Sequence, residues 1–200
     1  MISTRIFSLA AALALTAALA VPAYAAEGGG NGMPREFNAR MRVCAACHGE
    51  NGVPRAPTIP IIAGQREDYV LKQIHDFDTG ARKVEVMEWM AKAMTAEEKT
   101  AASALFAKRN WPAKVTQVAA AAAPRGVAVC QSCHQQNFMG AAQAEGMSTP
   151  RLAGQNYEYL VEEMRRFADG ERANNADMVQ IMKGLSAADR DAMAKYLAGL

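Results

Sequence analysis

Two cysteines separated by two residues and followed at once by a histidine occur twice in this chain of 200 residues. The two sets are Cys44, Cys47 and His48 in VCAACHGENG, and Cys130, Cys133 and His134 in VCQSCHQQN. A C-x-x-C-H run is the attachment signature of a c-type haem. The two thiols add to the vinyl groups of the porphyrin, and the adjacent imidazole can reach the iron as proximal ligand. The sequence therefore predicts two covalently attached haem c groups.

Other uses of paired cysteines fit the pattern less well. A redox-active C-x-x-C of the thioredoxin type belongs in a βαβ context, and the chain has no segments of alternating β-branched residues. A structural zinc site would close both pairs into one tetrahedron and would need no histidine after each pair. Disulfides are usual in exported proteins, but here each cysteine pair is followed by histidine.

The N-terminus has the pattern of a cleaved secretory signal peptide over residues 1–25. Arg5 supplies the positive charge, residues 6–21 are apolar, and AYA at residues 23–25 is an A-x-A cleavage site, so the mature chain is expected to begin at Ala26. The alternative is an uncleaved membrane anchor, but the apolar run is shorter than the roughly 20 residues that span a bilayer. The sequence thus predicts a soluble, exported protein.

Composition limits the remaining possibilities. Half of the residues are hydrophobic and the formal net charge is only +2, which suits one or two small globular domains. A nearly neutral balance argues against a nucleic-acid binder. The sequence shows no cluster of acid, base and nucleophile, which favours a protein that is not an enzyme.

The second half of the chain repeats the first. PIIAGQREDYVLKQIHDFDTGAR, beginning at Pro60, aligns with PRLAGQNYEYLVEEMRRFADGER, beginning at Pro150, at a constant offset of 90 residues. A tandem duplication with one haem motif per copy predicts domains at residues 26–115 and 126–200, joined by a linker at 116–125. The further identical pairs are Gly64/Gly154, Gln65/Gln155, Tyr69/Tyr159, Phe77/Phe167, Gly80/Gly170 and Arg82/Arg172.

Helices must position these motifs. REDYVLKQIHDF and NYEYLVEEMRRF place apolar residues three and four apart, and Gly80 and Gly170 suit the ends of these helices. Pro34 is expected to start a helix that runs into Cys47. Because each domain has fewer than a hundred residues, its apolar core is marginal without a buried haem. Two further segments open with capping boxes, formed by Thr95 with Glu98 and by Ser186 with Asp189.

The second axial ligand decides whether an iron carries electrons or binds a substrate. The chain has one histidine outside the motifs, His75, and the repeat aligns it with Arg165. A duplicated ligand should not align with arginine, so we interpret His75 as a surface residue of its helix.

Methionine is the other candidate ligand, and the chain has twelve. After Arg82 and its counterpart Arg172, the second copy has one additional residue, so the capping boxes align at an offset of 91 instead of 90. In that register only Met87 and Met178 are methionine in both copies. We therefore predict Met87 and Met178 as the axial ligands, with Met90 and Met182 as the alternatives. Met94 is interpreted as core, as unbranched methionines often are.

A repeated P-x-[IL]-A-G-Q loop offers a partner for each proximal histidine. A metal-bound histidine usually donates its second ring N–H to a fixed acceptor. The backbone carbonyls of Pro60 and Pro150 are candidates for that acceptor. The alternative is that these prolines only shape the loop.

Together these features resemble the dihaem class I cytochromes c, and most closely the cytochrome c4 family. The resemblance rests on CAACHG and CQSCH, the two P-x-[IL]-A-G-Q loops with their Tyr and F-x-x-G-x-R turn, RKVEVM, and LSAAD…YLAGL, and it covers nearly all of the mature chain. It implies an all-α fold of two tandem class I cytochrome c domains related by pseudo-twofold symmetry, with the haems facing each other across the interface. It also implies ligation by His48 with Met87 and by His134 with Met178.

The second copy departs from the pattern of the first at its haem motif. Gln135 follows the second motif, where Gly49 follows the first, and the segment before Cys130 is short and contains Gly126. These departures bear on the packing around the second haem rather than on its attachment.

The resemblance implies a periplasmic electron carrier of a respiratory chain. Its partners would be redox proteins: a donor such as a quinol-oxidising complex, and an acceptor such as a terminal oxidase or a dehydrogenase. It would dock to these partners transiently, and they can include membrane complexes. An alternative is the dihaem cytochrome subunit of a dehydrogenase, for example a sulfide-oxidising flavocytochrome. A dihaem peroxidase is disfavoured because it needs an open or switchable iron. We expect weak, salt-sensitive docking around the exposed haem edges, since transient redox pairs use small interfaces.

Overall fold

The computed structural model describes residues 35–113, 118–119, 121–142 and 148–200. The predicted signal peptide and Pro34 lie outside these residues, as does part of the predicted linker. The described part of the chain is helical, as predicted, with no strand and a single isolated bridge between Ala141 and Thr149.

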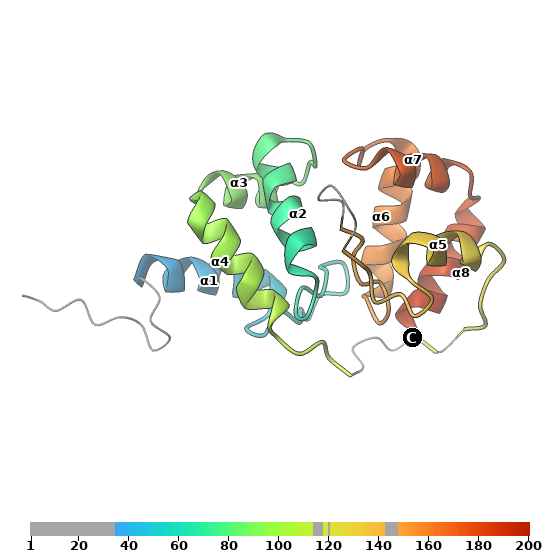
Figure 1. Ribbon diagram of the computed structural model, residues 1–200, viewed down its shortest axis with the longest axis horizontal. Helices are drawn as coiled ribbons and strands as arrows, with labels where there is room; N and C mark the ends of the chain where they lie inside the picture. Colours follow the sequence, from blue (N-terminus) through green and yellow to red (C-terminus); the bar gives the residue numbers. More distant parts are fainter. Residues whose placement is uncertain (1–34, 114–117, 120, 143–147) are drawn as a thin grey trace, which may run out of the picture.

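The helices form two successive groups of four (Figure 1). The first group contains α1 (Arg35–His48), α2 (Glu67–Thr79), α3 (Glu85–Lys92) and α4 (Ala96–Ala107). The second contains α5 (Val127–His134), α6 (Tyr157–Asp169), α7 (Ala176–Lys183) and α8 (Ala187–Ala198). Helices α2 and α6 face each other where the two groups meet (Figure 1). Each group thus corresponds to one copy of the sequence repeat.

Glycine ends the two central helices, as predicted. Gly80 follows α2 with φ 76°, and its N–H donates to the carbonyl of Phe77. Gly170 follows α6 with φ 78° and donates to the carbonyl of Phe167 in the same way. Glycine suits this left-handed position because it has no Cβ to clash with the following carbonyl. The chain can therefore turn back toward the short helices that carry the candidate methionines.

Side-chain caps start the last helix of each group. The Thr95 hydroxyl accepts from the Glu98 N–H at 3.2 Å, and the Glu98 carboxylate accepts from the Thr95 N–H at 2.9 Å, which completes the predicted capping box. At α8, the Ser186 hydroxyl accepts from the Asp189 N–H at 3.1 Å and donates to the Asp189 carboxylate at 2.6 Å. Such a cap stabilises a helix by about 1 kcal/mol.

Each group has its own hydrophobic core. The larger one lies in the second group, and its fully buried members include Phe138, Met193 and Leu197. In the first group, Phe37, Met94 and Ala102 form a smaller cluster between helices α1 and α4. Met94 is therefore a core residue, as the sequence predicted.

In the loop after the second haem motif, two residues other than glycine adopt a backbone conformation that favours glycine. The first copy has Gly49 at φ 76° and Gly52 at φ 79°, whereas the second has Gln135 at φ 71° and Phe138 at φ 57° in the corresponding places. The same turn forms in both copies, since the N–H of Gly52 donates to the carbonyl of Gly49 and that of Phe138 to that of Gln135. A residue with a Cβ loses roughly 1–2 kcal/mol in the left-handed region. Phe138 offsets this cost by complete burial, and the exposed Gln135 does not.

The two groups are joined by a reciprocal pair of glutamines. The side-chain oxygen of Gln65 accepts from the N–H of Arg151 at 2.8 Å, and its nitrogen donates to the Arg151 carbonyl at 3.0 Å. Gln155 makes the same two contacts with Ile61, at 2.8 and 2.9 Å. Ile61 and Arg151 occupy the same position of the repeat, so the contacts follow the predicted pseudo-twofold symmetry.

A ring of four buried side chains closes the same boundary. Arg82 donates to the side-chain oxygens of Gln73 and Glu163, both at 2.9 Å. Arg172 donates to the same two oxygens, at 3.0 Å for Gln73 and 2.6 Å for Glu163. Burial alone would raise the pKa of Glu163, but the two arginines outweigh it and lower that pKa. Two buried cations thus share one carboxylate.

We predict that Gln135→Gly raises the free energy of unfolding by about 1 kcal/mol, because it relieves the left-handed backbone without removing a buried contact. Denaturant unfolding of the haem-containing protein measures this. Gln136→Gly is the matched control, since Gln136 is an equally exposed neighbour that lies outside the left-handed region. A loss of stability in Gln135→Gly would show that the Gln135 backbone is not strained.

We also predict that Glu163→Gln lowers the free energy of unfolding by about 3 kcal/mol, because it leaves two buried arginines without an anion. Glu162→Gln is the control. Glu162 pairs with Arg165 at the surface, and its loss should cost about 1 kcal/mol or less. Equal effects of the two substitutions in thermal or denaturant unfolding would contradict the role assigned to the buried ring.

Candidate haem sites

Each C-x-x-C-H motif lies at the C-terminal end of a helix. Helix α1 ends at His48 and α5 ends at His134, so the three motif residues lie on one helical turn in each copy. The structure pairs none of the four cysteines in a disulfide; Cys44 and Cys130 are half-buried, while Cys47 and Cys133 are exposed. Burial raises the pKa of the Cys44 and Cys130 thiols. The described residues contain no group of three or more His, Cys, Asp or Glu side chains that could hold a metal ion among them.

Both motif histidines bind a proline carbonyl. The Nδ1 atom of His48 lies 3.1 Å from the carbonyl oxygen of Pro60, and that of His134 lies 3.1 Å from the carbonyl oxygen of Pro150. A carbonyl can only accept, so Nδ1 carries the proton and Nε2 keeps its lone pair for a metal. The predicted carbonyl partners are confirmed, and the alternative that the prolines only shape the loop is wrong.

The surroundings also favour the neutral form of the two imidazoles. Burial lowers the pKa of His48, and the hydrogen bond to Pro60 offsets only part of this effect. The same causes, burial first, lower the pKa of His134. A metal binds the unprotonated nitrogen of a neutral imidazole, so these surroundings are compatible with a ligand role for both residues.

The candidate methionines lie at equivalent places in the two copies. Met87 is the third residue of α3 and Met178 is the third residue of α7, which confirms the register used to pair them. Both side chains are half-buried, whereas the alternatives Met90 and Met182 are buried at 8% and 2% exposure. The side chain of Asn175 accepts from the N–H of Met178 at 2.9 Å and so fixes the start of α7.

His75 lies on the surface, as predicted. It is an exposed residue of α2, and its partner in the repeat, Arg165, forms ion pairs with three acidic side chains of its own group. This position of the repeat is therefore a surface position in both copies.

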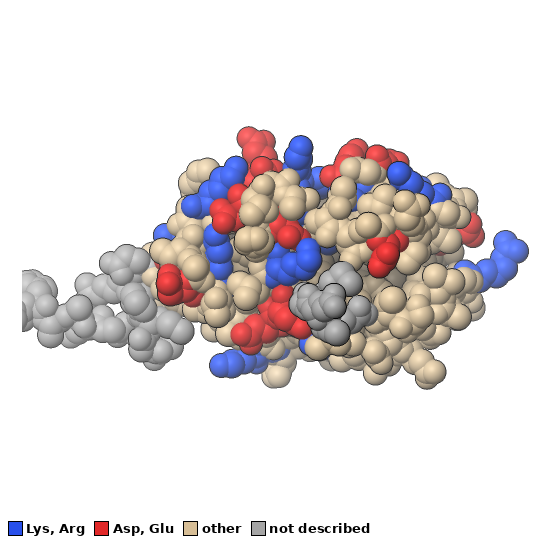
Figure 2. Space-filling model, turned by 45° about the horizontal axis from the view of Figure 1, so that its top comes forward, with Lys and Arg blue, Asp and Glu red and all other residues tan. Residues whose placement is uncertain are grey.

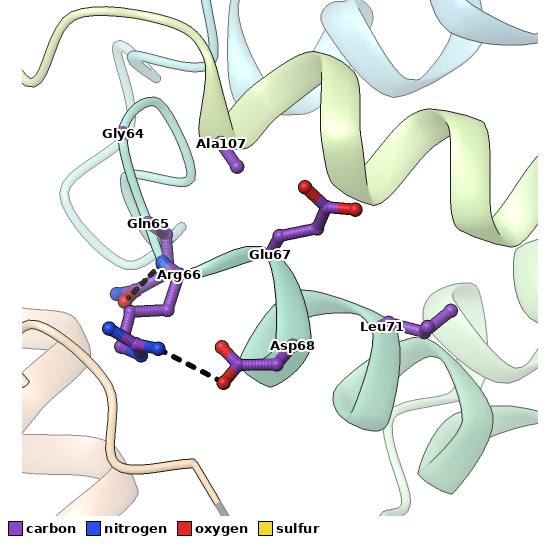
Figure 3. Close-up of a pocket in the computed structure, with 7 residues that line it drawn as sticks. All are labelled: Gly64, Gln65, Arg66, Glu67, Asp68, Leu71 and Ala107. Carbon is purple, nitrogen blue, oxygen red and sulfur yellow. Dashed lines mark hydrogen bonds and ion pairs between the residues drawn. The ribbon is translucent and has the colours of Figure 1, made fainter. Parts of the chain in front are cut away.

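A cavity of about 490 Å³ opens beside the start of α2 and the end of α4 (Figure 3). Figure 3 shows Arg66 paired with Asp68 on one side of it and Glu67 beside Ala107 on the other. None of the residues that line it is cysteine, histidine or methionine. This cavity is therefore separate from the haem-binding motifs.

Comparison with known proteins gives a consistent result. The cytochrome c family model matches residues 112–200. The cytochrome c4 of Pseudomonas aeruginosa is 33% identical over 175 residues, which cover 81% of this chain and 86% of that protein. This chain belongs to the cytochrome c4 family.

Two further relatives extend the comparison. The solved cytochrome c4 of Acidithiobacillus ferrooxidans superposes with a TM-score of 0.68 at 29% identity, covering 78% of this chain and 98% of that one. A protein of Stutzerimonas stutzeri named thiosulfate dehydrogenase electron acceptor is 31% identical, covering 82% of this chain and 81% of its own. The family and the two motifs identify a dihaem electron-carrying cytochrome with two covalent haem c groups. The unpaired thiols and neutral histidines of this structure fit that cofactor.

The residues that join the two copies were not assigned a role from the sequence. Gln65 and Gln155 stood out as an identical pair of the repeat, but their partners, the backbones of Ile61 and Arg151, belong to the opposite copy. Their identity in both copies was the available signal. It did not reveal which surface they contact.

We predict that replacing Cys130 and Cys133 by alanine leaves one covalently bound haem, held by Cys44 and Cys47. The thioether bonds form only at the thiols of each motif, so haem bound after acid extraction should fall from two per chain to one. Mass spectrometry of the denatured protein gives the count. The matched pair of substitutions at Cys44 and Cys47 should give the same number, and two haems in either variant would contradict the assignment.

Proposed function

We propose that this cytochrome is a periplasmic carrier of single electrons in a respiratory chain, with each iron held by one histidine and one methionine. The ligand pairs are His48 with Met87 and His134 with Met178. The observation that carries the proposal is the proline carbonyl on each motif histidine, at 3.1 Å in both copies. Two equivalent, neutral imidazoles indicate two irons of the same kind.

The ligand set determines what the irons can do. Thioether sulfur is a soft ligand that favours Fe(II) and raises the reduction potential. A haem iron held by both of these side chains, histidine and methionine, would offer no open position to a substrate and would supply one-electron chemistry. Outer-sphere electron transfer is then the chemistry available, which argues against a peroxidase and against enzymatic activity in general.

The proposed domains and location follow from the sequence. We place the signal peptide at residues 1–25, the N-terminal domain at 26–115, the linker at 116–125 and the C-terminal domain at 126–200. Among the described residues, no helix has the length and hydropathy needed to cross a bilayer. A cleaved signal peptide would release the protein into the periplasm.

Surface charge is consistent with short-lived docking to redox partners. On the face shown in Figure 2, basic and acidic side chains are intermixed, and neither sign forms a continuous field. Because complementary charge patches mainly set association rate and partner choice, this face does not single out one partner. We propose a quinol-oxidising complex as the class of donor and a terminal oxidase as the class of acceptor, with no role for nucleic acid.

A second candidate is the electron-accepting partner or subunit of a dehydrogenase. The relatives named thiosulfate dehydrogenase electron acceptor favour this alternative. Co-purification with a dehydrogenase from native membranes and periplasm, and reduction of the cytochrome by that enzyme's substrate, would support it. Reduction by a quinol-oxidising complex alone would favour the free carrier.

We predict that the reduced protein does not bind carbon monoxide, because both irons are six-coordinate. Met87→Ala and Met178→Ala should each leave one iron with a free coordination position. The visible spectrum of each variant should then show carbon monoxide bound to one of the two haems. Met90→Ala and Met182→Ala are the controls, since these methionines are buried alternatives and should leave both irons closed. Carbon monoxide binding by the unsubstituted protein would refute the ligation and bring a catalytic or gas-sensing role forward.

A further inference from the structure

Each proximal histidine is connected to the opposite copy through a single peptide group. The carbonyl of Pro60 accepts from His48, and the N–H of the same peptide group, on Ile61, donates to the side-chain oxygen of Gln155 at 2.8 Å. In the second copy, the carbonyl of Pro150 accepts from His134, and the N–H of Arg151 donates to Gln65 at 2.8 Å. Two hydrogen bonds therefore run in series from each histidine across the boundary.

The amide groups at the end of these chains are fixed in orientation. The oxygen of Gln155 accepts from the N–H of both Ile61 and Asn156, and its nitrogen donates to the Ile61 carbonyl at 2.9 Å. A flipped amide would place N–H against N–H and oxygen against oxygen. Gln65 is fixed in the same way by the backbones of Arg66 and Arg151.

Burial makes these contacts electrostatically effective. Gln65 and Gln155 are 4% and 3% exposed and Ile61 is 1% exposed, while Arg151, its counterpart in the second copy, is half-buried. Away from water, hydrogen bonds in series polarise one another, and each strengthens the next. An acceptor on the N–H side of a peptide group therefore increases the negative charge on its carbonyl oxygen.

We propose that Gln155 and Gln65 are positioning residues that tune, crosswise, the haem of the opposite copy. This inference rests on the proposed ligation by His48 and His134. Gln155 strengthens the Pro60 carbonyl as an acceptor and so makes the His48 imidazole a stronger donor to iron, which favours Fe(III). Gln65 acts on His134 in the same way. Each half of the chain thus holds down the reduction potential of the other half's haem.

The test replaces each glutamine by methionine, which has similar length and no strong acceptor. In Gln155→Met, the reduction potential of the N-terminal haem should rise, and that of the C-terminal haem should remain unchanged. The change in the equilibrium constant for electron exchange between the haems should be about threefold to tenfold, which for one electron corresponds to roughly 30–60 mV. Gln65→Met should raise the potential of the C-terminal haem instead.

Spectroelectrochemical titration measures the two potentials. The Met87→His variant assigns each potential to its haem, because this substitution should lower the potential of the N-terminal haem alone. Gln155→Glu keeps an oxygen acceptor of the same reach, so the potential should not rise in that variant. Gln73→Met is the matched control, because Gln73 is a buried glutamine at the same boundary whose oxygen contacts Arg82, Arg172 and Asn174 and neither proline peptide group.

A nuclear magnetic resonance readout follows the histidines directly. The chain has three histidines, so labelling with ¹⁵N-histidine gives a simple spectrum of the reduced protein. The Nδ1–H proton of His48 should move upfield in Gln155→Met because its hydrogen bond weakens, while that of His134 stays in place. The reverse is expected in Gln65→Met.

The outcomes separate the proposals. A shift of the haem in the same copy, an equal shift of both haems, or equal effects of Gln155→Met and Gln155→Glu would overturn the crosswise tuning. Unshifted potentials in Gln155→Met and Gln65→Met would overturn it as well. Failure of the ligation itself would appear separately, as carbon monoxide binding by the unsubstituted protein.

Discussion

One peptide group in each copy sustains both the haem site and the joining of the two copies. Its carbonyl accepts from the histidine of the haem motif, and its N–H donates to a glutamine from the opposite copy. Because a peptide group is planar, neither contact can move without the other. The helices determine where these loops lie, but the arrangement of the two sites depends on this shared peptide.

The sequence predicted the parts of the fold that repeat locally. The helical periodicity around α2 and α6, the terminal glycines and the Thr95 cap depend on neighbours along the chain, so they are found where expected. For the acceptor of each histidine the sequence left two roles open for the repeated prolines, and the structure decides for the carbonyl contact.

The contacts between the copies could not be predicted, because they depend on how two packed units meet. Gln73 and Glu163 align in the repeat but differ in charge, and only the structure shows that both accept from the same two arginines. The left-handed backbone at Phe138 was likewise not foreseen. A residue of that size would be unfavourable there if complete burial did not offset the strain.

The single carboxylate in the arginine ring has a consequence for the history of the chain. Two identical first copies would bring two arginines against two glutamines, and two identical second copies would bring them against two glutamates. Neither would reproduce the ring of one Gln73 and one Glu163 that the structure contains. Recombination or gene conversion between the halves would therefore change the charge of this ring, in which the two halves play different parts.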